Sequence, residues 1–395
     1  MTISTLSFQQ NALAQMEALE TDLSQTQQQL SSGTTLQNAA DNPGAMSQVN
    51  ELNMQLSASQ QYVTNGNAAN ANLTLEENAL TNATNLLQSA RSLAVEANNS
   101  ALSATQRQDI ATQLQQQLQQ LVGIANSTDS NGNYLFSGTD ASTQPFAQTG
   151  SSVSYSGSGE VNQVQIGPTQ SISAGDSGSS VFMNVPAGNG TFTTAAGAAN
   201  TGSASIDTGS VTDASEWVAD TYTITFTSPT QYQVTNSEGA TVTSGTYTSG
   251  NAIAFDGIEV TVSGTPATND TFTVAPAGTA SVFDTLSGLV NTLSSGTLSA
   301  AQIATQLGTG LQQIDNAINT IDNVQSSVGG RINAISTAQS SAQTQQTDIQ
   351  TEVSQLSDTD YSQAVTQLST EELALQAAQE SYASIEKLSL FNYLQ

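Results

Sequence analysis

Residues 25–46 read QTQQQLSSGTTLQNAADNPGAM, a polar stretch between two long helical patterns. Gly33 follows the glutamine-rich helix, and glycine often ends a helix because it adopts the positive φ of a C-cap without steric cost. Pro43 is tolerated in the first turn of a helix, where its missing N–H would have no partner. Asp41 and Asn42 are both able to cap that helix. We therefore predict that one helix ends at Gly33 and that the next begins at Pro43.

Proline and glycine divide the 395 residues into helical ends and a turn-rich middle. Six of the seven prolines lie between Pro145 and Pro276, and 21 of the 29 glycines lie between Gly132 and Gly296. Both residue types interrupt helices. The predicted fold is mainly α with an inserted β domain. It is a long antiparallel helical hairpin rod with both termini at one end and the small β domain at the other.

Thin apolar stripes at helical spacing mark both ends of the chain. Leu6 and Leu13 share one heptad position, and Met16, Leu23 and Leu30 share the other. The C-terminal stripe is stronger, because its members recur 4, 3, 7, 3, 4 and 3 residues apart. Its members are Tyr361, Val365, Leu368, Leu375, Ala378, Tyr382 and Ile385, and Leu388 follows.

A helix pair with so thin an apolar stripe is marginal in water on its own. We predict that residues 1–42 and 350–395 form coiled-coil arms, the inner layer of an assembly, whose stripes bind neighbouring subunits. The predicted interface residues are Leu6, Leu13, Met16, Leu23, Leu30, Val365, Leu368, Leu375, Tyr382, Ile385 and Leu388.

Longer apolar stripes lie in the sequence between the two arms. Apolar residues at helical spacing usually form the core of an ordinary bundle. We assign residues 43–140 and 281–349 to an antiparallel helical bundle. Between them the apolar residues alternate with the period of a strand, as in TYTITF, residues 221–226. Asp256-Gly257 lies between two such runs, which is a strong hairpin signal. Residues 141–280 are therefore predicted to be the β domain.

The composition excludes most catalytic chemistry. Without cysteine or histidine, the chain cannot use disulfides, thiol catalysis, Cys/His zinc sites or imidazole acid–base catalysis. Neighbouring residues on a helix point about 100° apart, so we interpret the pairs Glu76-Glu77 and Glu371-Glu372 as solvated faces. Residues 129–135, DSNGNYL, lack the glycine and glutamate of an EF-hand loop and are interpreted as a β-turn. We predict no enzyme, no cofactor and no metal site.

The charge is strongly acidic, with four basic residues against 32 carboxylates and a net charge of −28. No basic patch can form, so neither nucleic acid nor a membrane is an expected partner. No apolar run is long enough to span a bilayer. The N-terminal residues lack the features of a cleaved signal peptide.

Several motifs resemble those of the flagellin superfamily. LSSGTTLQNAADNPGAMSQVNEL, residues 30–52, is similar to its N-terminal motif, and residues 328–394, from VGGRINAI to LSLFNYL, are similar to its C-terminal partner. NYLFSGTDASTQPF (133–146), VNQVQIGPTQSISAGDSGSSVF (161–182) and the ending KLSLFNYL resemble the hook–filament junction branch more than filament flagellins.

The resemblance implies a structural adaptor of the bacterial flagellum, which joins the hook to the flagellin filament. The implied partners are hook-associated protein 1, flagellin, copies of the chain in a ring, and an export chaperone on the C-terminal helix. Export by the flagellar type III apparatus without a cleaved signal, and an extracellular location, are also implied. In such an assembly, the turn between inner and outer layers contains Gly33, Asn42, Pro43 and Gly44.

Three points stay open at the level of sequence. A filament flagellin has the same arms and export route. A surface-exposed binding module, in contrast, uses the β domain and the lone Trp217 to contact glycans or host proteins. Arg331, in VGGRINAI, is expected either to pair with a carboxylate of a neighbouring subunit or to be a simple surface arginine.

Overall fold

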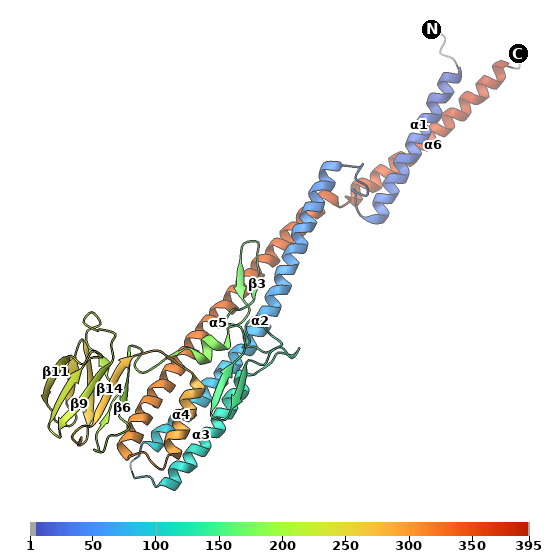
Figure 1. Cartoon of the computed structure of the whole chain (residues 1–395). Coiled ribbons are helices and arrows are strands. Elements are labelled where there is room, and N and C mark those ends of the chain that lie inside the picture. The colour runs from blue at the N-terminus through green and yellow to red at the C-terminus, as the bar shows by residue number, and fades with distance from the viewer. Residues whose placement is uncertain (1–4, 100, 394–395) are drawn as a thin grey trace. The chain divides into compact units, whose positions relative to one another are not determined.

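A computed structural model describes residues 5–99 and 101–393. The chain divides into two compact units, of which the first combines Met1–Thr64 with Ala338–Gln395 and the second is Asn65–Thr337. The described helices are α1 (Thr5–Ser32), α2 (Pro43–Ala97), α3 (Ala104–Ala125), α4 (Val282–Ser294), α5 (Ala300–Ser357), α6 (Tyr361–Tyr393) and a short π-helix, η1 (Ser179–Met183) (Figure 1).

The described strands all lie between α3 and α4, which confirms the prediction of a mainly helical chain with an inserted β domain. They are β1 (Phe146–Thr149), β2 (Ser152–Tyr155), β3 (Gln163–Gln165), β4 (Ser171–Ser173), β5 (Val185–Pro186), β6 (Phe192–Ala196), β7 (Ser205–Ile206), β8 (Ser210–Val211), β9 (Tyr222–Ser228), β10 (Gln231–Thr235), β11 (Thr241–Thr246), β12 (Ala252–Phe255), β13 (Ile258–Ser263), β14 (Thr271–Pro276) and β15 (Thr279–Ala280).

The first unit contains both terminal helices, and α1 packs along α6 (Figure 1). In the same unit, the beginning of α2 runs antiparallel to the end of α5. Gln48 Nε2 donates to Glu352 Oε1 (3.0 Å), and Ser59 Oγ donates to Ala342 O (3.2 Å). The later residue of α2 thus bonds to the earlier residue of α5, as in an antiparallel pair. Helix α5 continues without interruption through residue 350 and ends at Ser357.

The second unit is built around two buried helix stripes. Fully buried residues recur every seven positions along α2 and again along α5, as expected for helices that pack side by side. These residues are Leu73, Leu80, Leu87 and Ala94 in α2, and Leu307, Ile314, Ile321, Val328 and Ile335 in α5. Helix α4 packs on α3 in the same unit.

Two antiparallel sheets form the core of the β domain. One has the strand order β11-β10-β9-β14-β6, and the other has β12-β13-β7, with β8 also paired to β13. Tyr222, Ile224 and Phe226 of β9 are buried in one cluster with Ile258 and Val260 of β13. The inner faces of the two sheets therefore share one hydrophobic core, as in a β-sandwich.

The predicted hairpin at Asp256-Gly257 is confirmed. Phe255 pairs with Ile258 across the turn, and φ is positive at both central residues, 41° at Asp256 and 73° at Gly257. Positive φ at both positions is the geometry of a type I′ turn, which matches the twist of the two strands it connects.

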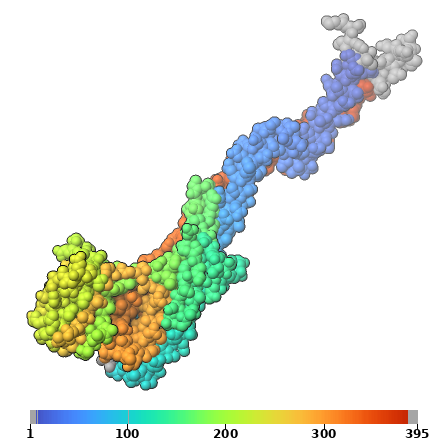
Figure 2. Space-filling view, viewed as in Figure 1, coloured from blue at the N-terminus to red at the C-terminus, as the bar shows by residue number. Residues whose placement is uncertain are grey.

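Three two-stranded ribbons, β1-β2, β3-β4 and β15-β5, lie outside the sandwich. The β3-β4 ribbon stands against α2, where Asn65 Nδ2 donates to Gln165 O (2.9 Å) (Figure 2). Near β1 and α4, Phe146 packs its ring against Phe182 and Phe283 at centroid distances of 5.7 and 5.1 Å. These contacts attach the β3-β4 and β1-β2 ribbons to the neighbouring helices.

Candidate assembly surface

The turn between α1 and α2 is built as its residues predict. Gly33 follows the last residue of α1 with a φ of 75°, and its N–H donates to Gln29 O (2.9 Å). A Cβ at Gly33 would lie 3.1 Å from the hydroxyl of Tyr361, so both the backbone and the available space favour glycine.

Asn42, not Asp41, caps α2. Its Oδ1 accepts a hydrogen bond from the Ala45 N–H (3.1 Å), and α2 begins at Pro43, with Gly44 in its first turn. The Asp41 carboxylate instead accepts the main-chain N–H groups of Gln37 and Asn38, at 3.0 and 2.9 Å. Asp41 thereby holds the loop, and Asn42 starts the helix.

Replacing Asn42 with alanine is expected to destabilise the first turn of α2 by about 1 kcal/mol, because the Ala45 N–H loses its partner. Amide hydrogen exchange at Ala45 and Met46 should become faster. Asn42→Asp retains a capping oxygen and serves as the matched control. Equal protection in the alanine and aspartate variants would show that the cap contributes nothing.

A second break in the helices lies between α5 and α6 and is hydrogen-bonded to the turn between α1 and α2. The sequence analysis did not predict this break, since it assigned residues 350–395 to one arm. Thr35 N–H donates to Ser357 O (2.6 Å), and Thr359 N–H donates to Gly33 O (3.0 Å). Asp360 caps α6 by accepting the Ser362 N–H at 2.9 Å. An aspartate directly before an apolar helical stripe is a typical N-cap, and this signal could have revealed the break.

The terminal helices α1 and α6 each bury a narrow stripe with heptad spacing of 4, 3, 4, 3 and 4 residues. We call these two stripes together the arm seam. Its residues are Ala12, Met16, Leu19, Leu23, Thr26 and Leu30 in α1, and Ala364, Leu368, Glu371, Leu375, Ala378 and Tyr382 in α6. Only Thr26 and Ala364 of this set are buried, and the others are half-buried.

The predicted interface residues fall into three groups. Met16, Leu23, Leu30, Leu368, Leu375 and Tyr382 are half-buried in the arm seam. Leu13 and Val365 lie outside it and are 48% and 49% exposed. The side chains of Leu6, Ile385 and Leu388 lie outside the described residues. The predicted residues whose side chains are described thus divide between an intramolecular seam and exposed positions.

Further apolar residues, which sequence reasoning did not place in the interface, are also exposed on these arms. Tyr361 is 55% exposed and Leu373 is 68% exposed. We use the term outer arm surface for Leu13, Tyr361, Val365 and Leu373. Met54, Val95 and Val218, outside these two helices, are also more than half exposed. Single exposed apolar residues are common on proteins, so exposure alone does not identify a binding surface.

The helix stripes of the second unit contain two charged residues, Glu76 and Arg331. Glu76 lies three residues after the buried Leu73 in α2, and Arg331 lies three residues after the buried Val328 in α5. Within each seven-residue repeat of such a stripe, the buried side of the helix is reached by alternating steps of three and four residues. A residue three positions after a buried one therefore lies on the same side, so both charged side chains point towards the region where apolar residues pack.

Asp176, in the loop between β4 and η1, joins these two charged residues. Its N–H donates to Glu76 Oε1 (3.1 Å), and its carboxylate forms an ion pair with Arg331. Arg331 also donates to Ser173 O (3.3 Å) and Gly175 O (3.1 Å). The loop is thereby fixed against both long helices, and we call Glu76, Asp176 and Arg331 the charged triad.

Two sequence-based expectations are corrected here. Glu76 does not face solvent but is only 1% exposed, because it occupies a position of the buried stripe. The other three glutamates of the pairs Glu76-Glu77 and Glu371-Glu372 differ in exposure. Glu77 and Glu371 are half-buried, and Glu372 is exposed. Arg331 is neither a simple surface arginine nor dependent on a neighbouring subunit for its ion pair, because it pairs with Asp176 of the same chain.

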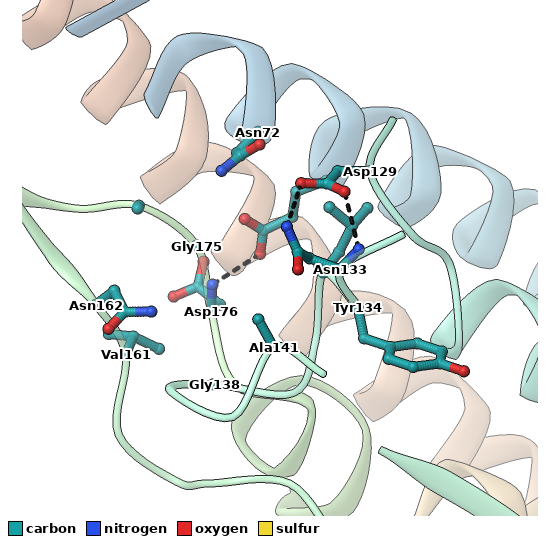
Figure 3. Close-up of a pocket in the computed structure, with 13 residues that line it drawn as sticks. Asn72, Asp129, Asn133, Tyr134, Gly138, Ala141, Val161, Asn162, Gly175 and Asp176 are labelled. Atoms are coloured by element: carbon teal, nitrogen blue, oxygen red, sulfur yellow. Dashed lines mark hydrogen bonds between the residues drawn. The ribbon is translucent and has the colours of Figure 1, made fainter. Parts of the chain in front are cut away.

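A polar pocket of about 210 Å³ lies beside the triad. Asp129 and Asn133, hydrogen-bonded to each other, are at one side of it, and Asp176 and Asn162 are at the other (Figure 3). The expected turn is present, since Gly132 N–H donates to Asp129 O (3.1 Å). In the part of the chain that the structure describes, no group of three or more acidic residues is arranged to hold a metal ion.

The pKa of Glu76 is raised from 4.5 to about 9, first by burial and then by the negative charge of Asp176, while Arg331 opposes the shift. The folded protein therefore binds this proton more tightly than the unfolded chain does. Stability from this group is complete below pH 4.5 and is lost as the pH rises to about 9.

Glu76→Gln cannot ionise and should therefore lack this pH dependence. Denaturant unfolding of both proteins should show the variant gaining stability relative to the wild type as the pH rises from 5 to 8, by at most about 1.4 kcal/mol per pH unit. Glu372→Gln, at an exposed position, is the control. A constant difference across this range would contradict a raised pKa.

No helix in the described residues is long and apolar enough to cross a membrane. Three family models match the chain. They are the bacterial flagellin N-terminal helical region over residues 3–141, the flagellar hook-associated protein 1 D2-like domain over 195–276, and the bacterial flagellin C-terminal helical region over 311–394.

Similar proteins include the flagellar hook-associated protein 3 of Escherichia coli (strain K12), which is 26% identical over 158 residues. That match covers 40% of this chain and 49% of the relative, so it spans about half of the relative's length.

Two crystal structures are similar over much more of the chain. Flagellar hook-associated protein 3 from Legionella pneumophila is 32% identical with a TM-score of 0.75, and the match covers 78% of this chain and 98% of that one. FlgL from Xanthomonas campestris is 32% identical with a TM-score of 0.72, and the match covers 77% and 99%. Because both structures are covered almost completely and both flagellin regions are present, the chain belongs to the FlgL (flagellar hook-associated protein 3) family of flagellin-like proteins.

Proposed function

We propose that this chain is a structural adaptor that joins the flagellar hook to the flagellin filament. The observation that carries the proposal is the similarity to hook-associated protein 3 and FlgL structures over nearly their whole length. Filament flagellin also has the two terminal regions, but the D2-like domain of hook-associated protein 1 over residues 195–276 favours a junction protein.

The outer arm surface supports the proposed mode of assembly. In this proposal the exposed apolar residues of α1 and α6 become buried against copies of the chain in a ring, against hook-associated protein 1 and against flagellin. The turn that contains Gly33, Asn42, Pro43 and Gly44 then connects an inner layer of arms to an outer layer. The role is structural, without catalysis or a cofactor.

The proposed location is extracellular, in the flagellum. The proposal includes export without a cleaved signal peptide, with a chaperone bound to α6 before export. An apolar stripe along α6, from Ala364 to Tyr382, supports this step. In the folded chain this stripe packs in the arm seam against α1, and in the proposal the chaperone takes the place of α1 on it.

Deletion of the gene tests the function directly. A strain without this chain should keep its hooks and release flagellin into the medium, because the filament has no attachment point. If the chain were the filament subunit, deletion would leave no flagellin of this type to release. Filaments attached normally in the deletion strain would reject the adaptor function.

A further inference from the structure

Three asparagines in the sequence, Asn65, Asn131 and Asn189, are each followed by glycine. Glycine lacks the side chain that would hinder its main-chain nitrogen from reaching the preceding asparagine side chain. The structure places the three pairs in different environments. We propose that Asn131 is a site of spontaneous deamidation in the folded protein, and that the fold protects Asn65 and Asn189.

The reaction needs only water. The main-chain nitrogen of Gly132 attacks Cγ of Asn131 and loses its proton, and the new N–Cγ bond closes a cyclic imide. The bond from Cγ to the side-chain nitrogen breaks, and that nitrogen takes up a proton and leaves as ammonia. Water then opens the imide at one of its two carbonyls. The product is aspartate, or isoaspartate with one more carbon in the main chain.

Asn131 is less constrained than the other two asparagines. It is exposed, and among the described residues its side-chain amide interacts with the Asp129 carboxylate alone. The attacking Gly132 N–H donates to Asp129 O (3.1 Å). Asn189 has the same kind of turn bond, from Gly190 N–H to Ala187 O (3.0 Å), so this bond does not distinguish the two sites. Gly132 has a φ of 84°, and no atom lies within 4 Å of the place where its Cβ would be, so there is open space on this side of the main chain. Asp129 holds the turn by accepting the Asn131 N–H at 2.8 Å.

Asn189 is held at both ends of its amide. Its Oδ1 accepts the N–H groups of Thr191 (3.0 Å) and Phe192 (2.9 Å), and its Nδ2 donates to Thr208 O (3.3 Å) and Gly209 O (3.2 Å). Rotation of Cγ towards the following nitrogen must break at least one of these bonds. The loss of one such bond slows a reaction by about tenfold.

Asn65 lies inside helix α2, and its Nδ2 donates to Gln165 O (2.9 Å). Closure of the imide at this position requires both the loss of that bond and local opening of the helix. The reaction at Asn65 is therefore expected to be slower still than at Asn189.

Peptide mapping by mass spectrometry of the full-length protein, aged at mildly alkaline pH, tests the proposal. Asn131 should gain the mass of deamidation at a rate within several-fold of a synthetic peptide of residues 127–135. Asn65 and Asn189 should react at least about tenfold more slowly than Asn131. In urea-unfolded protein all three should react at similar rates.

The products give a second measurement. Enzymatic methylation of isoaspartate should label the aged wild type and should largely disappear in Asn131→Gln, which cannot form the five-membered imide. Asn189→Gln should leave the label unchanged. An unreacted Asn131 at a time when the reference peptide is converted, or a faster reaction at Asn189 or Asn65, would overturn the proposal.

Discussion

A Val365→Asp variant is expected to fold like the wild type and to lose filament attachment. Val365 is 49% exposed on α6 and lies outside the arm seam, so the folded chain does not need its methyl groups as core. Valine and aspartate have similar helix propensities. The free energy of unfolding should therefore change by no more than about 0.5 kcal/mol.

Assembly responds differently, because the outer arm surface is proposed to become buried between subunits. An unpaired carboxylate in that interface would be far from water and would cost several kcal/mol at each copy. In the deletion strain, the Val365→Asp chain should therefore release flagellin into the medium, although circular dichroism of the purified variant shows normal helix content.

Gln367→Asp is the matched control. Gln367 is an exposed polar residue of the same helix, about 160° away around the helix axis from Val365 and about 120° from Tyr361 and Leu373. The substitution introduces the same side chain and the same charge away from the outer arm surface, and it should retain attached filaments. Normal attachment with Val365→Asp, or equal loss with both variants, would reject the outer arm surface as the interface.

Arg331→Met is expected to destabilise the second unit by about 3 kcal/mol, the largest stability effect that we predict from one side chain. The substitution leaves the carboxylate of Asp176 without its cation next to the buried Glu76. It also leaves the carbonyl groups of Ser173 and Gly175 without their donor. Urea unfolding of the full chain, followed by the single Trp217, measures the loss.

Arg91→Met is the control for this prediction, because Arg91 also pairs with an aspartate, Asp315, at 2.6 Å in the same unit. The side chains of Arg91 and Asp315 are 47% and 39% exposed, compared with 13% and 25% for Arg331 and Asp176. An exposed ion pair contributes at most about 1 kcal/mol. Equal losses in the two variants would show that burial of the triad is energetically unimportant.

A triple variant separates charge from packing. Adding Asp176→Asn and Glu76→Gln to Arg331→Met removes all charges of the triad together. Replacing a whole buried charged group is usually much less costly than removing one partner. The triple variant should therefore regain part of the lost stability.

Local features of the chain were readable from sequence because they depend on a few neighbouring residues. Gly33 ends α1 through its own backbone freedom, Pro43 begins α2, and Asp256-Gly257 forms its predicted turn. The break at Asp358–Asp360 could have been read in the same way from the capping aspartate.

The charged triad could be predicted only in part. The spacing of Glu76 after Leu73 places it on the buried side of α2, so a closer reading of the stripe could have shown that it is not solvated. Asp176 is 100 residues from Glu76 and 155 residues from Arg331 along the chain. No local pattern predicts that a loop so distant in sequence supplies the partner.

The sequence by itself determined the helical ends, the β insert and the turn between the first two helices, because helix period, strand period and turn geometry are properties of short stretches. Only the tertiary structure decided which apolar residues of the arms are half-buried in the arm seam and which remain exposed. It also decided that Glu76 keeps its proton beside Asp176 and Arg331. Burial and pKa depend on which distant segments pack together, and that packing is a property of the whole folded unit.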